Sequence, residues 1–88
     1  MTTYKQSSQQ VSCKIDGEIA ILHLDRAIYF GLQGAGADIW DALAQPKSLD
    51  ELRDAVLAKF DVSPHQCESD IVEILATLEK EGLVETVR

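Results

Sequence analysis

The chain has 88 residues and a formal net charge of -7 at neutral pH, a length that supports one domain with a single modest core. Its hydrophobic fraction of 45% excludes an intrinsically disordered chain, and no apolar run approaches the ~20 residues that a membrane-spanning helix requires. The polar segment 1–10 does not have the pattern of a signal peptide. We therefore predict a cytoplasmic protein with a flexible N-terminal lead-in over 1–10 and one domain over 11–88.

The first third of the chain has the pattern of an antiparallel hairpin. Apolar and polar residues alternate over 11–15, the period of a strand with one polar face. The next two residues, Asp16 and Gly17, favour a two-residue type I′ turn because glycine accepts a positive φ. The segment 19–24 is apolar at nearly every position, which is typical of a central strand with both faces partly covered.

A third strand is predicted over 27–32, where alternate side chains share one face and Tyr29 points to the other. The simplest topology for three consecutive strands is an antiparallel meander, which leaves this third strand at an open edge. Proline, lysine and glutamate, which block the pairing of edge strands, are missing from 27–32. The sequence therefore predicts a free strand edge at these residues.

Three helices are expected in the rest of the chain. Glycines precede the first helix, which contains Trp40, and Pro46 ends it. Ser48 begins the second helix, with Glu51 at the capping-box position three residues later. Ser63 caps the third helix before Pro64 and Gln66, and Gly82 ends it with Leu83 closing over Leu78, as in a Schellman motif. The residues expected to face the core are Ile39, Trp40, Leu43, Leu49, Leu52, Val56, Phe60, Cys67, Ile71, Ile74, Leu75 and Leu78.

These elements define an α+β fold of winged-helix-like type, with a three-stranded antiparallel meander followed by a three-helix bundle. The charge is divided unevenly between the two parts. Residues 1–33 carry three acidic and three basic side chains, whereas residues 34–88 carry twelve acidic and five basic ones. The helical part is therefore expected to repel phosphate backbones and to accept a basic or neutral partner.

The residues that could carry chemistry are few and far apart. Cys13, Cys67, His23 and His65 never approach the short spacings of zinc ligands, and no nucleophile stands beside a candidate base. We therefore predict no enzymatic activity, no metal and no cofactor. The two cysteines are interpreted as buried or half-buried thiols in a reducing cytosol, although their separation in the sequence leaves a disulfide open.

Two other classes of small domain share some of these features. An acyl carrier protein carries its modified serine after an aspartate at a helix start, whereas Ser48 follows Lys47 and is already a helix cap. A winged-helix DNA-binding domain has the expected topology, but its recognition helix should present basic residues to phosphates. The third helix offers five acidic residues against Lys80 alone. DNA binding, or another protein-interaction role, stays as the alternative function.

Short motifs follow one another from Val11 to Val84: Leu24-Asp25, Tyr29-Phe30-Gly31-Leu32, Gly36 with Ile39-Trp40 and Leu43, Ser48-Leu49-Asp50-Glu51-Leu52, Phe60-Asp61-Val62, Asp70-Ile71, and Leu78 with Gly82-Leu83-Val84. In this order and spacing they resemble the PqqD-like family, also called RiPP precursor peptide recognition elements. Gln33 departs from the asparagine that such proteins often carry.

The resemblance implies a non-catalytic adaptor that binds the leader segment of a ribosomal precursor peptide as an extra strand. Free-standing members serve pyrroloquinoline quinone, lasso-peptide and other peptide-modification pathways, and the aromatic residues here look closer to the lasso-peptide type. The implied partners are a leader peptide and a modifying enzyme or leader protease. Nucleic acid and membranes are not expected as partners, and the domain is expected to be a monomer or a weak homodimer.

The predicted binding site combines the open strand with one face of the third helix. The leader is expected to pair antiparallel with residues 28–32, with Tyr29 and Phe30 as side walls. Asp70, Ile74 and Thr77 form an i, i+4, i+7 row beside the core stripe, so that Ile74 is either the floor of a groove or ordinary core. The expected peptide-binding residues are Ile28, Tyr29, Phe30, Gly31, Leu32, Asp70, Ile74 and Thr77.

Overall fold

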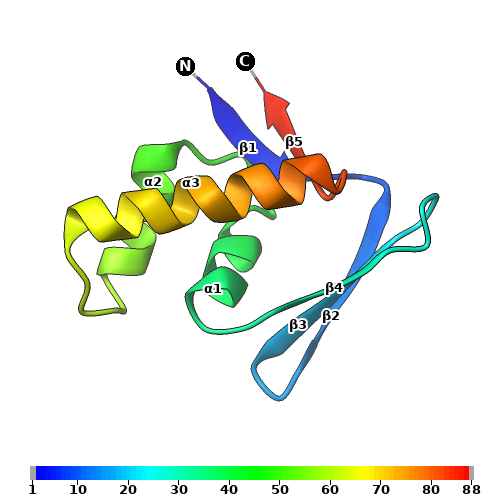
Figure 1. The fold of residues 1–88 in the computed structure, drawn as a ribbon, viewed down its shortest axis with the longest axis horizontal. Coiled ribbons are helices and arrows are strands. Elements are labelled where there is room, and N and C mark those ends of the chain that lie inside the picture. Colours follow the sequence, from blue (N-terminus) through cyan, green and yellow to red (C-terminus); the bar gives the residue numbers. More distant parts are fainter. Residues whose placement is uncertain (1, 88) are drawn as a thin grey trace.

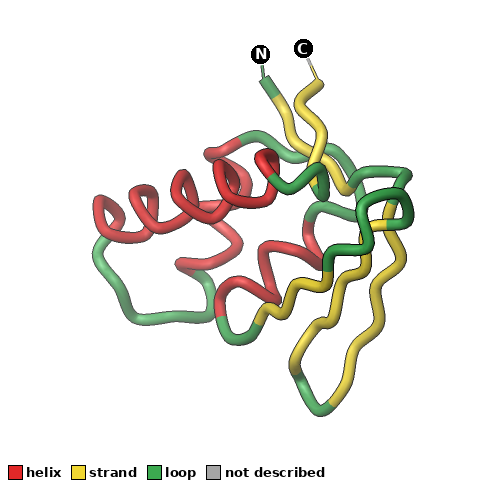
Figure 2. The backbone as a smooth tube through the Cα atoms, turned by 45° about the vertical axis from the view of Figure 1, so that its right-hand side comes forward, coloured by secondary structure: helices red, strands yellow, loops and turns green. Residues whose placement is uncertain are grey.

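The computed structural model describes residues 2–87 and contains two antiparallel sheets and three helices (Figure 1). One sheet has the strand order β2-β3-β4, and the other pairs β1 with β5. The helices lie to one side of the three-stranded sheet (Figure 2). The elements in chain order are β1 (Thr3–Gln6), β2 (Gln10–Ile15), β3 (Glu18–His23), β4 (Tyr29–Leu32), α1 (Ala35–Ala42), α2 (Leu49–Leu57), α3 (Pro64–Lys80) and β5 (Val84–Val87).

The predicted meander followed by three helices is confirmed. The turn between β2 and β3 has positive φ at both central residues, 51° at Asp16 and 82° at Gly17, as a type I′ turn requires. The third strand is shorter than the predicted 27–32 and begins at Tyr29. The reason is a φ of 53° at Ala27, which takes the backbone out of the extended conformation just before β4.

Only one face of the three-stranded sheet is covered by the helices. Ile19, Ile21 and His23 of β3 are buried on that face, whereas Leu22 on the other face is exposed. The prediction that both faces of the central strand are partly covered was therefore wrong. Strand β2 turns its polar side inward, because Ser12 accepts a hydrogen bond from the buried indole of α1.

This orientation of β2 also corrects the expectation for the cysteines. Cys13 lies on the uncovered side of the strand and is exposed, while Cys67 is buried under α2 as predicted. Both are free thiols, so the disulfide that the sequence left open does not form.

Helices α2 and α3 begin where the sequence predicted caps. At α2 the Ser48 hydroxyl accepts from the Glu51 N–H at 3.2 Å, and the Glu51 carboxylate accepts from the Ser48 N–H at 2.9 Å. This hydrogen bond to the backbone lowers the pKa of the Glu51 carboxyl. At α3 the Ser63 hydroxyl accepts from the Gln66 N–H. These bonds satisfy backbone donors that the first turn of a helix leaves free.

A Schellman motif ends α3. The Gly82 N–H donates to the Glu79 carbonyl at 3.0 Å, and the Leu83 N–H donates to the Leu78 carbonyl at 2.9 Å. Gly82 has a φ of 75°, and Leu83 and Leu78 are fully buried. The motif therefore turns the chain sharply from α3 into β5.

The lead-in predicted over 1–10 was wrong for Thr3–Gln6, which forms β1. Its partner is β5, with Thr3 opposite Val87 and Gln6 opposite Val84, so the two ends of the described chain lie side by side (Figure 1). Tyr4 also exchanges backbone hydrogen bonds with Lys47 at 2.8 and 2.9 Å. The segment Val84–Val87 is the strand that orders these N-terminal residues.

The core lies between the sheet and the helices. Trp40 is 1% exposed and contacts two other elements through polar atoms. Its Nε1 donates to the Ser12 hydroxyl at 3.2 Å, and its backbone carbonyl accepts from the Gln6 side chain at 2.8 Å. The residues buried in this core are Ile19, Ile21, Ala37, Ile39, Trp40, Leu43, Leu52, Val56, Cys67, Ile71, Leu75, Leu78, Leu83 and Val84.

Within residues 2–87, none of the helices has the length and apolarity needed to cross a bilayer.

Replacement of Gly82 should destabilise the domain more than replacement of another positive-φ glycine. A Cβ on Gly82 would lie 3.0 Å from His23 Nε2, whereas one on Gly17 would meet no atom within 4 Å. Both Gly→Ala changes force alanine into the left-handed region, which costs about 1–2 kcal/mol. Urea denaturation should give a larger loss of unfolding free energy for Gly82→Ala than for Gly17→Ala. Equal losses would show that the contact with His23 relaxes freely.

Candidate functional site

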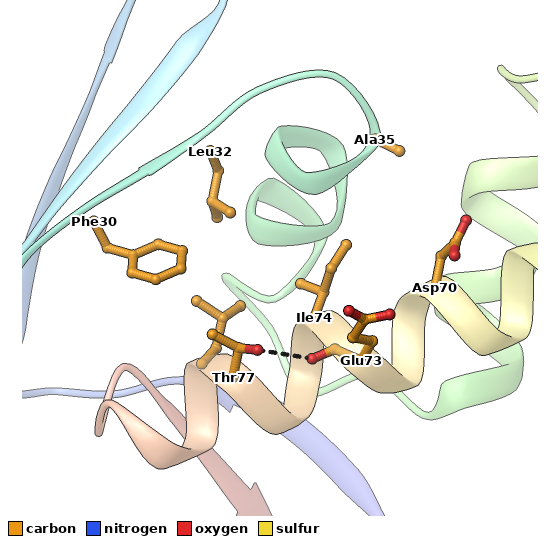
Figure 3. Close-up of a pocket in the computed structure, with 8 residues that line it drawn as sticks. Phe30, Leu32, Ala35, Asp70, Glu73, Ile74 and Thr77 are labelled. Carbon is orange, nitrogen blue, oxygen red and sulfur yellow. Dashed lines mark hydrogen bonds between the residues drawn. The ribbon is translucent and has the colours of Figure 1, made fainter.

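An apolar cavity lies between β4 and α3 (Figure 3). Its volume is about 380 Å³. Phe30 and Leu32 point toward it from the strand, and Ile74 points toward it from the helix. The lining residues are Phe30, Leu32, Ala35, Asp70, Glu73, Ile74, Thr77 and Leu78. We refer to this cavity as the β4–α3 groove.

The structure brings together most of the residues predicted from the sequence, but it separates Tyr29 from them. Phe30 and Leu32 occupy alternate positions of β4, so both face the groove. The other positions of the strand face the opposite side of the sheet, as the pleat of a strand requires. Tyr29 stands opposite the exposed Leu22 on that other face and is itself exposed. Tyr29 therefore does not form a side wall with Phe30, which corrects that expectation. Ile28 precedes β4 and does not line the groove.

The backbone of Tyr29 and Gly31 faces the open edge of the sheet. The His23 N–H donates to the Ile28 carbonyl at 2.9 Å, so these two residues form a hydrogen-bonded pair at the start of the β3–β4 ladder. Such pairs alternate along antiparallel strands. The β3–β4 register then directs the polar groups of Phe30 toward β3, and those of Tyr29 and Gly31 away from it. Strand β4 thus presents backbone donors and acceptors beside the groove.

Ile74 forms the middle of the groove floor. It is half-buried and packs against the hydrophobic core, yet it also lines the groove. Leu78, one turn later, is fully buried and closes the floor at its deep side. One side of the Ile74 side chain therefore packs on the core and the other lines the groove, so both alternatives left open by the sequence apply in part.

Ala35, Glu73 and Leu78 also line the groove, although they were not among the predicted binding residues. Glu73 follows Asp70 by three positions and so shares its helix face, a spacing that could have revealed it. Ala35 begins α1 directly after Gly34, the positive-φ cap that turns the chain from β4 into the helix. Its position depends on the tertiary fold, and no local pattern indicates it.

One rim of the groove is acidic. Asp70 and Glu73 are exposed on α3, and Asp70 accepts a hydrogen bond from the Gln66 side chain at 2.8 Å. The Thr77 hydroxyl donates to the Glu73 carbonyl at 3.1 Å (Figure 3), which leaves its oxygen free to accept. The rim can therefore receive cationic or hydrogen-bond-donating groups, while Phe30 and Ile74 receive apolar ones.

A smaller cavity of about 80 Å³ adjoins the groove and shares Ala35, Asp70 and Ile74 with it. Phe60 is among its lining residues. Cys67 also lines this cavity, and burial raises the pKa of its thiol, so it stays protonated at neutral pH.

The corner between β3 and β4 is fastened to the end of α3. His23 Nδ1 accepts from the N–H groups of Asp25 and Arg26 at 3.1 and 3.2 Å. The Arg26 guanidinium donates to the Lys80 carbonyl at 3.3 Å. These bonds connect the corner before β4 to the C-terminal end of α3. From the sequence, His23 was predicted only not to be a zinc ligand, and this positioning role was missed.

Among the residues that the structure describes, no cluster of three or more histidine, cysteine or acidic side chains could hold a metal ion. The groove is instead an apolar channel flanked by an unpaired strand. This is the geometry by which sheet-edge domains add an extended peptide, with backbone bonds on one side and side-chain pockets on the other.

Comparison with known families identifies the class. The family described as "Coenzyme PQQ synthesis protein D (PqqD)" matches residues 18–84, which include the sheet edge and all three helices. The chain belongs to the PqqD family. The resemblance predicted from the sequence is thereby confirmed. No curated protein matches the chain.

Two solved structures share the fold. The structure described as "TbiB1 in Complex with the TbiA(beta) Leader Peptide" is 37% identical and has a TM-score of 0.86, with 92% of this chain and 94% of that chain covered. The structure described as "Lasso peptide synthetase B1 complexed with the leader peptide" is 17% identical and has a TM-score of 0.82, with 93% and 96% covered. The second likeness concerns the fold alone.

Ile74→Asp should leave the domain folded, whereas Leu78→Asp should not. A charge at position 74 can turn into the open groove, and the loss of half-buried apolar contact costs about 1–2 kcal/mol. A charged side chain at the fully buried position 78 has no open space into which it can turn. A buried unpaired charge lowers the free energy of unfolding by several kcal/mol. Circular dichroism with urea denaturation measures both. Unfolding of Ile74→Asp would place Ile74 in the core.

Proposed function

We propose that the β4–α3 groove binds the leader segment of a ribosomally made precursor peptide as an additional antiparallel strand on β4. The observation that carries this proposal is the unpaired edge of β4 beside an apolar groove on α3. Membership of the PqqD family supports it. So does the 37% identical relative, which is a complex with a leader peptide.

The geometry divides the binding into two parts. The N–H and C=O groups of Tyr29 and Gly31 supply main-chain hydrogen bonds that any extended peptide can use. Alternate leader side chains then point toward Phe30, Leu32 and Ile74, which select apolar residues. Affinity thus comes from the strand edge, and specificity comes from the groove.

The acidic rim adds a preference for charge. Asp70 and Glu73 stand at one side of the groove, where a basic or hydrogen-bonding leader residue would meet them. The helical part of the chain carries the whole net charge of -7, which strengthens the attraction for a basic segment at low ionic strength. The thiol of Cys67 stays buried behind the groove and takes no part in binding.

The domain acts as an adaptor and not as a catalyst in this proposal. Its role is to hold the leader while a separate modifying enzyme or leader protease acts on the rest of the precursor, in the biosynthesis of a lasso peptide or a related product. The family and the leader-peptide complexes among its structural neighbours are consistent with this division of labour. Turnover of the precursor by the purified domain alone would overturn it.

Gly31→Pro should abolish strand addition while leaving the fold intact. The Gly31 N–H faces the open edge, so proline removes a donor that β3 does not use and places its ring against the incoming strand. We expect a loss of at least 10-fold in affinity for the TbiA(beta) leader peptide, the ligand in the complex of the 37% identical relative, measured by fluorescence polarisation. Gly31→Ala is the matched control, because its Cβ meets no atom within 4 Å. Unchanged affinity in a folded Gly31→Pro variant would contradict binding at β4.

The folded Ile74→Asp variant tests the other side of the groove. Loss of the apolar floor should weaken leader binding by about 1–3 kcal/mol, the value of burying one such side chain. Val72→Asp serves as the control, because Val72 is exposed on α3 and does not line the groove. If both variants bind as the original chain does, the leader does not rest on α3.

Nucleic acid is not expected to bind. Helix α3, which corresponds to the recognition helix of a winged-helix protein, carries four acidic side chains and a single lysine, Lys80, so binding to DNA would release few counterions. A mobility-shift titration at low salt, where electrostatic attraction is greatest, should show no complex at micromolar concentrations. Tight and salt-sensitive binding there would favour the DNA-binding alternative.

A further inference from the structure

The imidazole of His23 connects three parts of the domain. His23 is the last residue of β3 and is 7% exposed. Its Nδ1 accepts hydrogen bonds from the N–H groups of Asp25 and Arg26 in the corner before β4. Its Nε2 lies beside the turn that follows α3, where a Cβ added to Gly82 would approach it within 3.0 Å. The ring therefore lies between β3, the corner 24–28 and the end of α3.

The corner itself has a strained backbone. Ala27 has a φ of 53°, in the left-handed region that only glycine adopts freely. A non-glycine residue keeps such a conformation only where its surroundings impose it. The two bonds to Nδ1 precede Ala27 directly, and the Arg26 guanidinium bonds to the Lys80 carbonyl of α3. Because Tyr29 begins β4 two residues after Ala27, the corner determines where the open strand starts.

Only the neutral imidazole can hold the corner in this way. An Nδ1 that accepts hydrogen bonds carries no proton, so the proton of the neutral ring is on Nε2. The protonated ring has an N–H at both nitrogens, and its Nδ1–H would face the two backbone donors of Asp25 and Arg26. Histidine is the side chain that ordinarily changes its charge between about pH 5 and 8. Uptake of one proton by His23 would therefore break both hydrogen bonds.

Gln10 offers an acceptor to the protonated ring. It is the cross-strand partner of His23 on β2. The His23 N–H points to Ile28 on the other side, so Gln10 and His23 form the non-hydrogen-bonded kind of pair, in which the side chains lie closest. Among residues 2–87, the Gln10 Oε1 is buried and has no hydrogen-bond partner, and an imidazolium N–H would satisfy it. The protonated ring can therefore leave the corner and bond to Gln10.

A positive charge on His23 would also act against the Arg26 anchor. The Arg26 guanidinium lies beside Gly82 as His23 does, with its Nη1 3.5 Å from the position of an added Cβ. The two like charges would repel each other and weaken the bond to the Lys80 carbonyl. Among the residues that the structure describes, no carboxylate forms an ion pair with His23. The charged residues on the elements that adjoin the ring are Asp25, Arg26, Glu79, Lys80, Glu81 and Glu85.

We propose that His23 is a positioning residue for leader binding, and that its protonation releases the leader. This inference rests on the proposed function. The neutral ring holds the corner that places the backbone of Tyr29 and Gly31 beside the groove. The protonated ring turns away from Asp25 and Arg26, so the start of β4 loses its fixed position relative to α3. The domain thus holds the leader at neutral pH and binds it weakly in mildly acidic solution.

The pH dependence of leader affinity separates this role from a purely structural one. With the TbiA(beta) leader peptide as the probe, affinity should fall about 10-fold between about pH 7.5 and about pH 5.5, as the loss of one or two hydrogen bonds implies. In His23→Asn, the Oδ1 atom replaces Nδ1 as the acceptor, as in an Asx turn, and takes up no proton. The affinity of this variant should change less than about 2-fold over the same range. His65→Asn removes the exposed histidine at the start of α3, so this matched control should keep the full pH dependence.

His23→Leu tests the acceptor itself. Leucine leaves the N–H groups of Asp25 and Arg26 without their acceptor, so affinity at about pH 7.5 should fall about 10-fold, whereas asparagine at the same position should retain it. Calorimetry in buffers of different ionisation enthalpy measures the protons that leave on binding. At about pH 6 the original chain should release protons when the leader binds, because binding requires the neutral ring. His23→Asn should release none.

The outcomes decide between these roles. A pH-dependent affinity that His23→Asn abolishes, in a domain that circular dichroism shows to be folded at both pH values, supports the proposal. Equal affinity of the original chain at the two pH values would overturn it, as would the same loss of affinity in His23→Asn. Unfolding of the original chain at the lower pH would also overturn it, because release would then be a global effect. Failure to bind the leader at either pH would contradict the proposed function itself, and with it this inference.

Discussion

The arrangement of the domain depends on Trp40, which joins the sheet to the helices. The indole is buried, its N–H donates to Ser12 in β2, and the carbonyl of the same residue accepts from Gln6 in β1. One residue of α1 therefore contacts strands from both sheets. A buried indole whose N–H has a partner contributes its full apolar area without a desolvation penalty. The orientation of β2, with its polar side inward, follows from this contact.

Strand β4 must be held firmly and yet stay unpaired along one edge, and the structure achieves both by fixing its ends. The corner before β4 is bonded to His23 and, through Arg26, to the end of α3. After β4, Gly34 turns the chain into α1 with a φ of 60°. Both anchors lie outside the strand, so the backbone between them stays available. An edge fixed in advance loses little conformational entropy when a peptide pairs with it.

Sequence reasoning recovered the features that local signals encode. The turn at Asp16-Gly17, the cap at Ser48 and the Schellman motif at Gly82 each rest on a few adjacent residues, and each was predicted correctly. The pairing of Thr3–Gln6 with Val84–Val87 joins segments about 80 residues apart, and no local pattern reveals it. The exposure of Cys13 was missed for a related reason. Alternation shows that a strand has two sides, but the side that faces the core is decided by tertiary contacts such as that of Ser12 with Trp40.

The antiparallel pairing of β1 with β5 has a consequence for engineering the chain. Thr3 stands directly opposite Val87, so a short peptide link could join the two ends and make the backbone circular without strain. Closing a loop of this size lowers the entropy of the unfolded chain, which by the chain-entropy model stabilises the fold by roughly 4 kcal/mol. The ring could then be reopened at the exposed Asp16-Gly17 turn, giving a circular permutant whose new ends lie at the tip of the β2–β3 hairpin.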